Sequence, residues 1–83
     1  MPSPFDLLEE LLAEMAKTLV DHPEEVQVRA VQGQAMTNLE LRVHPEDIGK
    51  VIGRHGRTAQ ALRTIIGAAG WKLHEHVTVE IID

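Results

Sequence analysis

The chain has 83 residues, a formal net charge of −5 and no cysteine. This length predicts one domain, residues 1–83, with a modest core and little room for a deep catalytic cleft. The missing cysteines exclude disulfides, thiolate catalysis and cysteine-ligated zinc. No apolar run reaches the roughly 18 residues of a membrane span, and the N-terminus lacks the basic start of a signal peptide. We therefore expect a cytoplasmic protein without membrane contact.

The chain begins with a helical pattern. Ser3 suits the N-cap position, and Asp6 stands three residues later, which resembles a capping box. Apolar residues then recur at helical spacing as far as Leu19. Because Pro23 disfavours helical backbone at the residue before it, the pattern predicts a helix over about 4–21.

Three segments alternate apolar and polar residues as half-buried strands do. The first two, 26–31 and 37–43, are separated by a turn at Gly33 and predict an antiparallel hairpin. The third segment, 76–82, closes the chain. The side chains predicted to face the core are Val26, Val28, Ala30, Leu39, Leu41, Val43, Val77, Val79 and Ile81.

Two helical patterns lie between the hairpin and the last strand. Pro45 suits the start of a helix of barely two turns, which Gly53 stops. A longer helix is predicted from Arg57 to about Ala69, with Gly70 as its C-cap. Its apolar stripe is formed by Ala59, Leu62, Ile66 and Ala69.

The predicted element order is α-β-β-α-α-β, an α+β fold. A last strand that follows so long a crossover pairs most simply in parallel with the second strand, with a right-handed connection. We therefore expect a three-stranded mixed sheet with the helices on one face.

The stretch between the two inner helices combines glycine with positive charge. Gly53 and Gly56 enclose Arg54 and His55, and the next helix begins immediately afterwards. Glycine permits positive φ and close backbone approach, while a helix N-terminus attracts anions. Five basic residues meet only two acidic ones between 44 and 74, in a chain that is otherwise acidic. The pattern indicates a site for a phosphate backbone, flanked by Lys50 and Arg57.

The stretch GKVIGRHGRTAQALRTII resembles the K-homology (KH) signature V-I-G-x-x-G. The element order is similar to the type II KH arrangement of bacteria, and the resemblance covers nearly the whole chain. It is most similar to the small, single-KH RNA-binding proteins of bacteria. The N-terminal helix would then precede a KH core over about 25–83.

This resemblance implies single-stranded RNA as partner, held through about four nucleotides of backbone at the G-x-x-G loop. Ile52 and Leu62 would support an aliphatic surface for the bases, although Ala59 stands where many KH motifs carry Ile. It also implies an RNA chaperone or post-transcriptional regulator linked to cell shape and division. The implied RNA-binding residues are Lys50, Ile52, Gly53, Arg54, His55, Gly56, Arg57 and Thr58.

Other functions stay open on the residues alone. A helix-turn-helix DNA reader could use Arg57, Thr58, Gln60 and Arg63, but three strands fit no simple version of that motif. His74 and His76 share one strand face, yet no further metal ligand or catalytic partner is evident, so neither an enzyme nor a cofactor is expected.

A protein interaction module is the third reading. Ala61, Ile65 and Ala68 form a second stripe on the long helix, which is either extra core or a partner surface. The resemblance favours a homodimer, or a heterodimer with a larger KH-containing bacterial protein.

Overall fold

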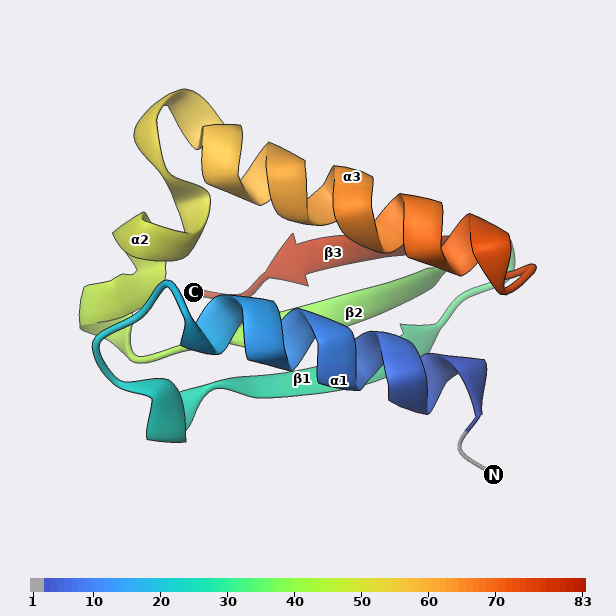
Figure 1. Cartoon of the computed structure of the whole chain (residues 1–83), viewed down its shortest axis with the longest axis horizontal. Helices are drawn as coiled ribbons and strands as arrows, with labels where there is room; N and C mark the ends of the chain where they lie inside the picture. Colours follow the sequence, from blue (N-terminus) through green and yellow to red (C-terminus); the bar gives the residue numbers. More distant parts are fainter. Residues whose placement is uncertain (1–2) are drawn as a thin grey trace.

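The computed structural model describes residues 3–83 and contains three α-helices, three strands and three short 3-10 turns. The predicted order α-β-β-α-α-β is confirmed (Figure 1). The elements are α1 (Pro4–Lys17), β1 (Gln27–Gln32), β2 (Thr37–Arg42), α2 (Ile48–Ile52), α3 (Arg57–Lys72) and β3 (Val77–Ile81), with 3-10 turns at Pro23–Glu25, Pro45–Asp47 and Arg54–Gly56.

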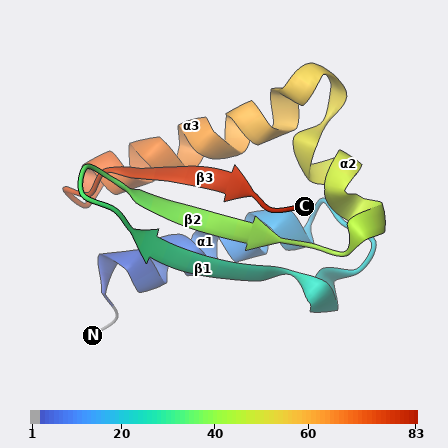
Figure 2. The same cartoon turned by 180° about the vertical axis from the view of Figure 1, so that it is seen from behind.

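The sheet is mixed and has the strand order β1-β2-β3. Strands β1 and β2 are antiparallel, with Ala30 opposite Leu39, whereas β2 and β3 are parallel, with Leu39 opposite Val79. Helices α1 and α3 cover one face (Figure 1), and the other face is open (Figure 2). The α+β prediction with helices on one face is therefore confirmed.

The core lies between this sheet and the two long helices. It is aliphatic, because the chain has only one Phe and one Trp. Its buried apolar residues come from both helices and from β2, β3 and α2, and they include Leu8, Leu12, Leu39, Leu41, Val51, Leu62, Ile66 and Val79.

The predicted start of α1 is confirmed, but its predicted end near 21 is wrong. Ser3 and Asp6 form a reciprocal capping box with two bonds of 3.2 Å. The helix ends at Lys17 with Thr18 as its C-cap, and the Thr18 hydroxyl donates to the carbonyl of Met15 at 2.6 Å. The following residues then turn toward α2, so Leu19 lies outside the helix and is exposed.

Gly70 is not the C-cap that the sequence predicted. Helix α3 continues to Lys72, and the left-handed residue after it is His74, with φ 63°. A Cβ at Gly70 would clash with Val77 and lie 2.9 Å from the carbonyl oxygen of Glu75. Glycine at this position allows the chain entering β3 to pack directly on the helix.

Candidate nucleic-acid interface

The G-x-x-G loop joins α2 to α3 and projects from one end of the molecule, toward which β3 also points (Figure 1). Three of its four residues have positive φ: Gly53 at 76°, His55 at 58° and Gly56 at 73°. Left-handed backbone is unfavourable for residues with a Cβ, and such positions cluster at functional sites. The loop is thus a specialised backbone shape and not only a tight helix connection.

The two glycines serve different needs. A Cβ on Gly53 would overlap the side chain of Thr58 and lie 2.9 Å from its backbone nitrogen. At Gly56, no atom lies within 4 Å of the position that a Cβ would occupy. Gly53 therefore allows the loop to fold back on the start of α3, and Gly56 leaves an open approach to the same helix end.

The positive side chains at the loop tip face solvent. Arg54, His55 and Arg57 are all exposed, and within residues 3–83 no carboxylate lies within 4.0 Å of them. Helix α3 starts at Gly56 without a side-chain cap. The N–H of Gly56 donates to the carbonyl of Gly53 at 3.1 Å and that of Arg57 to the carbonyl of Arg54, so it is mainly the positive end of the helix dipole that is directed toward this surface.

Lys50 differs from these three residues because it already has partners. Its ammonium lies 3.3 Å from Asp21 and 3.7 Å from Asp47. The hydrogen bond to Asp21 raises the pKa of Lys50 above its usual value. Lys50 thus lies on α2 shortly before the loop, but two carboxylates compete with any phosphate for its ammonium group.

The predicted apolar support divides into core and surface. Ala59 and Leu62 are buried on α3, each 4% exposed. Ile52, the last residue of α2, is 37% exposed beside the loop. Ile52 is therefore accessible to a ligand at the loop, whereas Leu62 packs in the core and stabilises α3.

A buried carboxylate that sequence reasoning missed fixes α2 to the rest of the fold. Asp47 is fully buried, and its Oδ2 accepts 3.0 Å bonds from both the backbone N–H and the ring Nδ1 of His22. Burial alone raises the pKa of Asp47, but the bonds from His22 and the backbone of Asp21 outweigh it and lower the pKa. The same bond raises the pKa of His22. From its place in the sequence, Asp47 is expected to interact with the helix dipole, and no local pattern predicts its bonds to His22.

His22 also stacks on His44, with ring centroids 4.0 Å apart and planes 14° from parallel. With Glu46, the two rings offer three ligand atoms within 4.8 Å of one another. However, Nδ1 of His22 is bonded to Asp47, and Nδ1 of His44 accepts from the N–H of Glu46 at 3.0 Å. Because the lone pairs of nearly parallel rings do not converge on one point, we assign this cluster a structural role.

The predicted partner stripe on α3 lies on the surface. Ala61, Ile65 and Ala68 are exposed, and Ile65 is 47% exposed. Ile65 is therefore not core. On α1, Leu7 and Leu11 are also exposed, at 44% and 37%.

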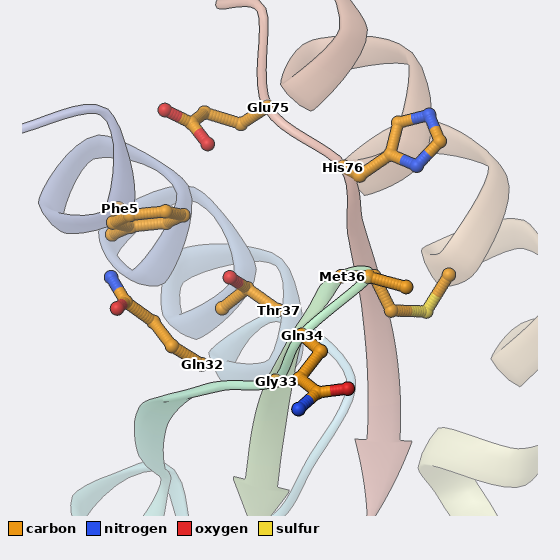
Figure 3. A pocket seen from close by; sticks show the side chains of 9 residues that line it. Phe5, Gln32, Gly33, Gln34, Met36, Thr37, Glu75 and His76 are labelled. Carbon is orange, nitrogen blue, oxygen red and sulfur yellow. The ribbon is translucent and has the colours of Figure 1, made fainter.

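A separate cavity of about 360 Å³ lies beside the β1–β2 turn (Figure 3), at the end of the sheet away from the G-x-x-G loop (Figure 1). Phe5, the β1–β2 turn, Glu75 and His76 line it. His74 and His76 are both exposed. The cavity is remote from the positive surface, because the G-x-x-G loop precedes α3 whereas Glu75 and His76 follow it.

Comparisons with known proteins agree with this geometry. The family model described as KhpA/KhpB, KH domain, matches residues 9–81. The chain is 55% identical over 75 residues to the RNA-binding protein KhpA of Clostridium acetobutylicum, covering 90% of this chain and 100% of that one. It is 49% identical over 77 residues to the KhpA of Streptomyces coelicolor, covering 93% and 94% of the two chains.

Among solved structures, a crystal structure of Aquifex aeolicus Era matches with a TM-score of 0.60 and 21% identity, over 90% of this chain and 29% of that chain. That likeness concerns the fold alone. Within residues 3–83, no helix is long and apolar enough to cross a membrane. On its sequence and its fold, the chain belongs to the KhpA/KhpB KH-domain family, a family of RNA-binding proteins and not of enzymes.

Proposed function

We propose that the protein binds single-stranded RNA by clamping its phosphate backbone with the G-x-x-G loop. The loop supplies backbone of positive φ at Gly53 and Gly56, and its exposed positive or polar groups are those of Arg54, His55 and Arg57. Lys50, Ile52 and Thr58 border the loop on α2 and α3.

One observation carries this proposal: the left-handed loop coincides with the uncapped start of α3. Successive backbone N–H groups in such loops form anion-binding concavities, and a helix N-terminus adds its dipole. The relatives named RNA-binding protein KhpA support RNA as the anion. KH loops clamp about four nucleotides of a single strand, which fits a surface of this size.

The test reverses the charge of the loop tip. We expect Arg54→Asp with His55→Asp to weaken binding of fluorescein-labelled octauridine by at least about tenfold in an anisotropy titration, since one charged hydrogen bond contributes about 1.5–3 kcal/mol. Circular dichroism is expected to stay native, because both side chains are exposed.

The matched control is Arg29→Asp with His76→Asp, which makes the same charge change at exposed positions away from the loop. Equal losses in both double variants would show a general charge effect and reject the clamp. Duplex DNA of the same length in the same titration addresses the helix-turn-helix alternative, which requires the duplex to bind more tightly.

The exposed stripe of α3 supports a second part of the proposal, an interface formed by Ala61, Ile65 and Ala68. A second copy of the chain is the occupant that we propose, and a larger KH-containing bacterial protein is the alternative. Small residues on both sides of Ile65 let a partner helix approach closely, and a two-fold axis closes such a patch. Two loops in one particle would raise the avidity for a longer RNA.

The cellular role that we propose is RNA chaperoning or post-transcriptional control in the cytoplasm, linked to cell shape and division. It rests on the KH resemblance and on the RNA-binding relatives. Crosslinking the protein to RNA in cells and sequencing the bound RNA tests it. Recovery of no RNA above an Arg54→Asp, His55→Asp background would reject it.

A further inference from the structure

Strand β3 has an open edge, and the backbone direction of each of its residues follows from two bonds. The N–H of Thr37 donates to the carbonyl of His76, and the N–H of Ile82 donates to the carbonyl of Leu41, each at 2.9 Å. In a parallel strand, alternate residues direct their backbone groups to opposite sides. The even-numbered residues therefore pair with β2, and the backbone of Val79 faces the open edge.

One row of α3 runs along this edge. Its residues recur every three or four positions, which places them on one side of the helix. Gly70 packs on Val77, and a Cβ at Gly67 would lie 4.0 Å from the Val77 carbonyl oxygen. The row starts at the G-x-x-G loop and comprises Gly56, Ala59, Arg63, Gly67 and Gly70.

Arg63 is the only residue of this row with a side chain longer than a methyl group. Its Nε donates to the carbonyl of Val79 at 3.1 Å, and this bond holds the guanidinium at the open edge of β3. A guanidinium has five N–H donors, and this bond uses one of them. Within residues 3–83, no carboxylate lies within 4.0 Å of Arg63.

We propose that Arg63 reads a base of the bound RNA and selects guanine over adenine. The inference rests on the proposed function, because it requires RNA clamped at the loop. Two neighbouring N–H donors fit the O6 and N7 acceptors of guanine, whereas adenine presents an N–H₂ donor beside its N7. Single-stranded RNA exposes these edges because its bases are unstacked.

The position of Arg63 relative to the loop suits this task. Arg63 follows Gly56 by seven residues, which is about 10 Å along a helix axis. Helix α2 and the C-terminal half of β3 border the same end of the molecule (Figure 1). At about 100° per residue, Arg63 and Ile65 lie roughly 160° apart around α3, so RNA on one flank leaves the proposed partner stripe free.

Binding of two labelled RNAs, (UUG)3 and (UUA)3, tests the proposal by fluorescence anisotropy. We expect the wild-type protein to bind (UUG)3 about tenfold more tightly, as a bidentate arginine–guanine pair predicts. Arg63→Lys keeps the positive charge but loses the fork, so we expect the ratio to fall close to one while binding of (UUA)3 changes little. Arg63→Met keeps the apolar stem and removes every N–H donor, so we expect the ratio of the two affinities to fall close to one in this variant too.

The matched control is Arg29→Lys, an exposed arginine of β1 at the opposite edge of the sheet (Figure 2), which is expected to keep the wild-type ratio. Arg57→Met, by contrast, is expected to weaken the binding of both RNAs equally, because a contact to phosphate does not depend on the base. The ¹⁵Nε–¹H resonance of Arg63 gives a second readout, since it is expected to shift with (UUG)3 and much less with (UUA)3.

The outcomes separate the two proposals. Wild-type protein that binds both RNAs equally, or a preference that survives Arg63→Lys, overturns the role of Arg63 and leaves RNA binding intact. Wild-type protein that binds neither RNA overturns the proposed function itself. If the variants unfold, an unshifted Arg63 resonance in the wild-type complex with (UUG)3 still overturns the base-reading role.

Discussion

Gly53 and Gly56 both have positive φ, but only Gly56 is left-handed helical (ψ 14°, against 172° at Gly53), and only Gly53 is confined by a neighbour. Left-handed backbone costs an alanine roughly 1–2 kcal/mol relative to ordinary helical backbone. We expect Gly56→Ala to lower the free energy of unfolding by about that amount, because a Cβ there meets no atom within 4 Å. Gly53→Ala adds a clash with Thr58 and is expected to cost more.

Urea denaturation followed by circular dichroism compares the two glycine variants. Gly49→Ala is the control, since a Cβ at Gly49 also meets nothing within 4 Å and its φ is not positive. That variant is expected to be neutral or stabilising, because alanine favours helix. Equal losses of unfolding free energy in Gly53→Ala and Gly56→Ala would contradict the role of the contact with Thr58.

The His22–Asp47 pair makes stability depend on pH. The pKa of His22 is raised above 6.5, so its contribution is fully present below that pH and is lost as pH rises through the raised value. The pKa of Asp47 is lowered below 3.8, so its contribution is present above that pH and is lost as pH falls through the lowered value. The pair therefore stabilises the fold most between about pH 4 and 6.5.

We expect His22→Gln to lower the Tm, and to lower it more at pH 5 than at pH 8. Thermal melts by circular dichroism at both values measure the difference. The control is His76→Gln, an exposed histidine with no carboxylate within 4.0 Å in the part of the chain that the structure describes. A larger effect of His22→Gln at pH 8 would reverse the expected sign and reject the linkage.

At the scale of elements, α2 is short, and tertiary contacts hold it in place. It has only five residues, too few for a stable isolated helix. Asp47 anchors its start to His22, Val51 is buried, and Lys50 bonds to Asp21. The segment after α1 thus sets the position of α2, and with it the position of the loop.

The contact between Asp21 and Lys50 predicts a gain of affinity. Asp21→Asn removes the nearer of the two carboxylates that compete for Lys50 and leaves only Asp47, at 3.7 Å, so we expect tighter binding of octauridine at low salt. The increase is expected to shrink as salt rises, because both effects are electrostatic. Glu10→Gln removes one exposed carboxylate from α1 and serves as the control. A similar gain in both variants would mean that net charge alone is responsible.

The whole molecule carries net negative charge but concentrates positive groups at one end. The formal charge is −5, whereas Arg54, His55 and Arg57 are exposed together at the loop. If RNA binds through these three side chains, its affinity depends on the local electrostatic field and the geometry of the loop, and not on the net charge of the protein. The helix layer also exposes Leu7, Leu11 and Ile65, and a small domain gains stability by covering such apolar surface.

We expect Ile65→Asp to convert a dimer into a folded monomer. A carboxylate at the centre of the stripe would be buried without a partner in the dimer, but it is tolerated on a monomer surface, where substitutions usually change stability by less than about 0.5 kcal/mol. Light scattering gives the mass, and thermal melting at low protein concentration reports the fold. Met36→Asp, at a residue of similar exposure (45%) in the β1–β2 turn, is the control. A wild-type protein of monomer mass would reject the homodimer.

Local patterns determined much of this protein. Period-two alternation identified all three strands, and the capping box at Ser3 identified the start of α1. The spacing of Gly53 and Gly56 between two helical patterns marked the loop, because left-handed backbone requires particular residues wherever it occurs. These features depend on neighbours in the sequence, so the sequence alone predicts them.

Long-range contacts decided the remainder. Asp47 lies 25 residues from His22, yet their bonds join the segment after α1 to the start of α2. Gly70 read as a helix end, but the packing of Val77 makes it a point of close approach inside α3. From the sequence, Arg63 was a candidate only for the helix-turn-helix alternative, and the tertiary structure places it beside the Val79 carbonyl of the parallel strand β3. Such contacts join segments that hydropathy and spacing treat separately, because the free energy of burial and hydrogen bonding depends on which groups meet in the folded chain.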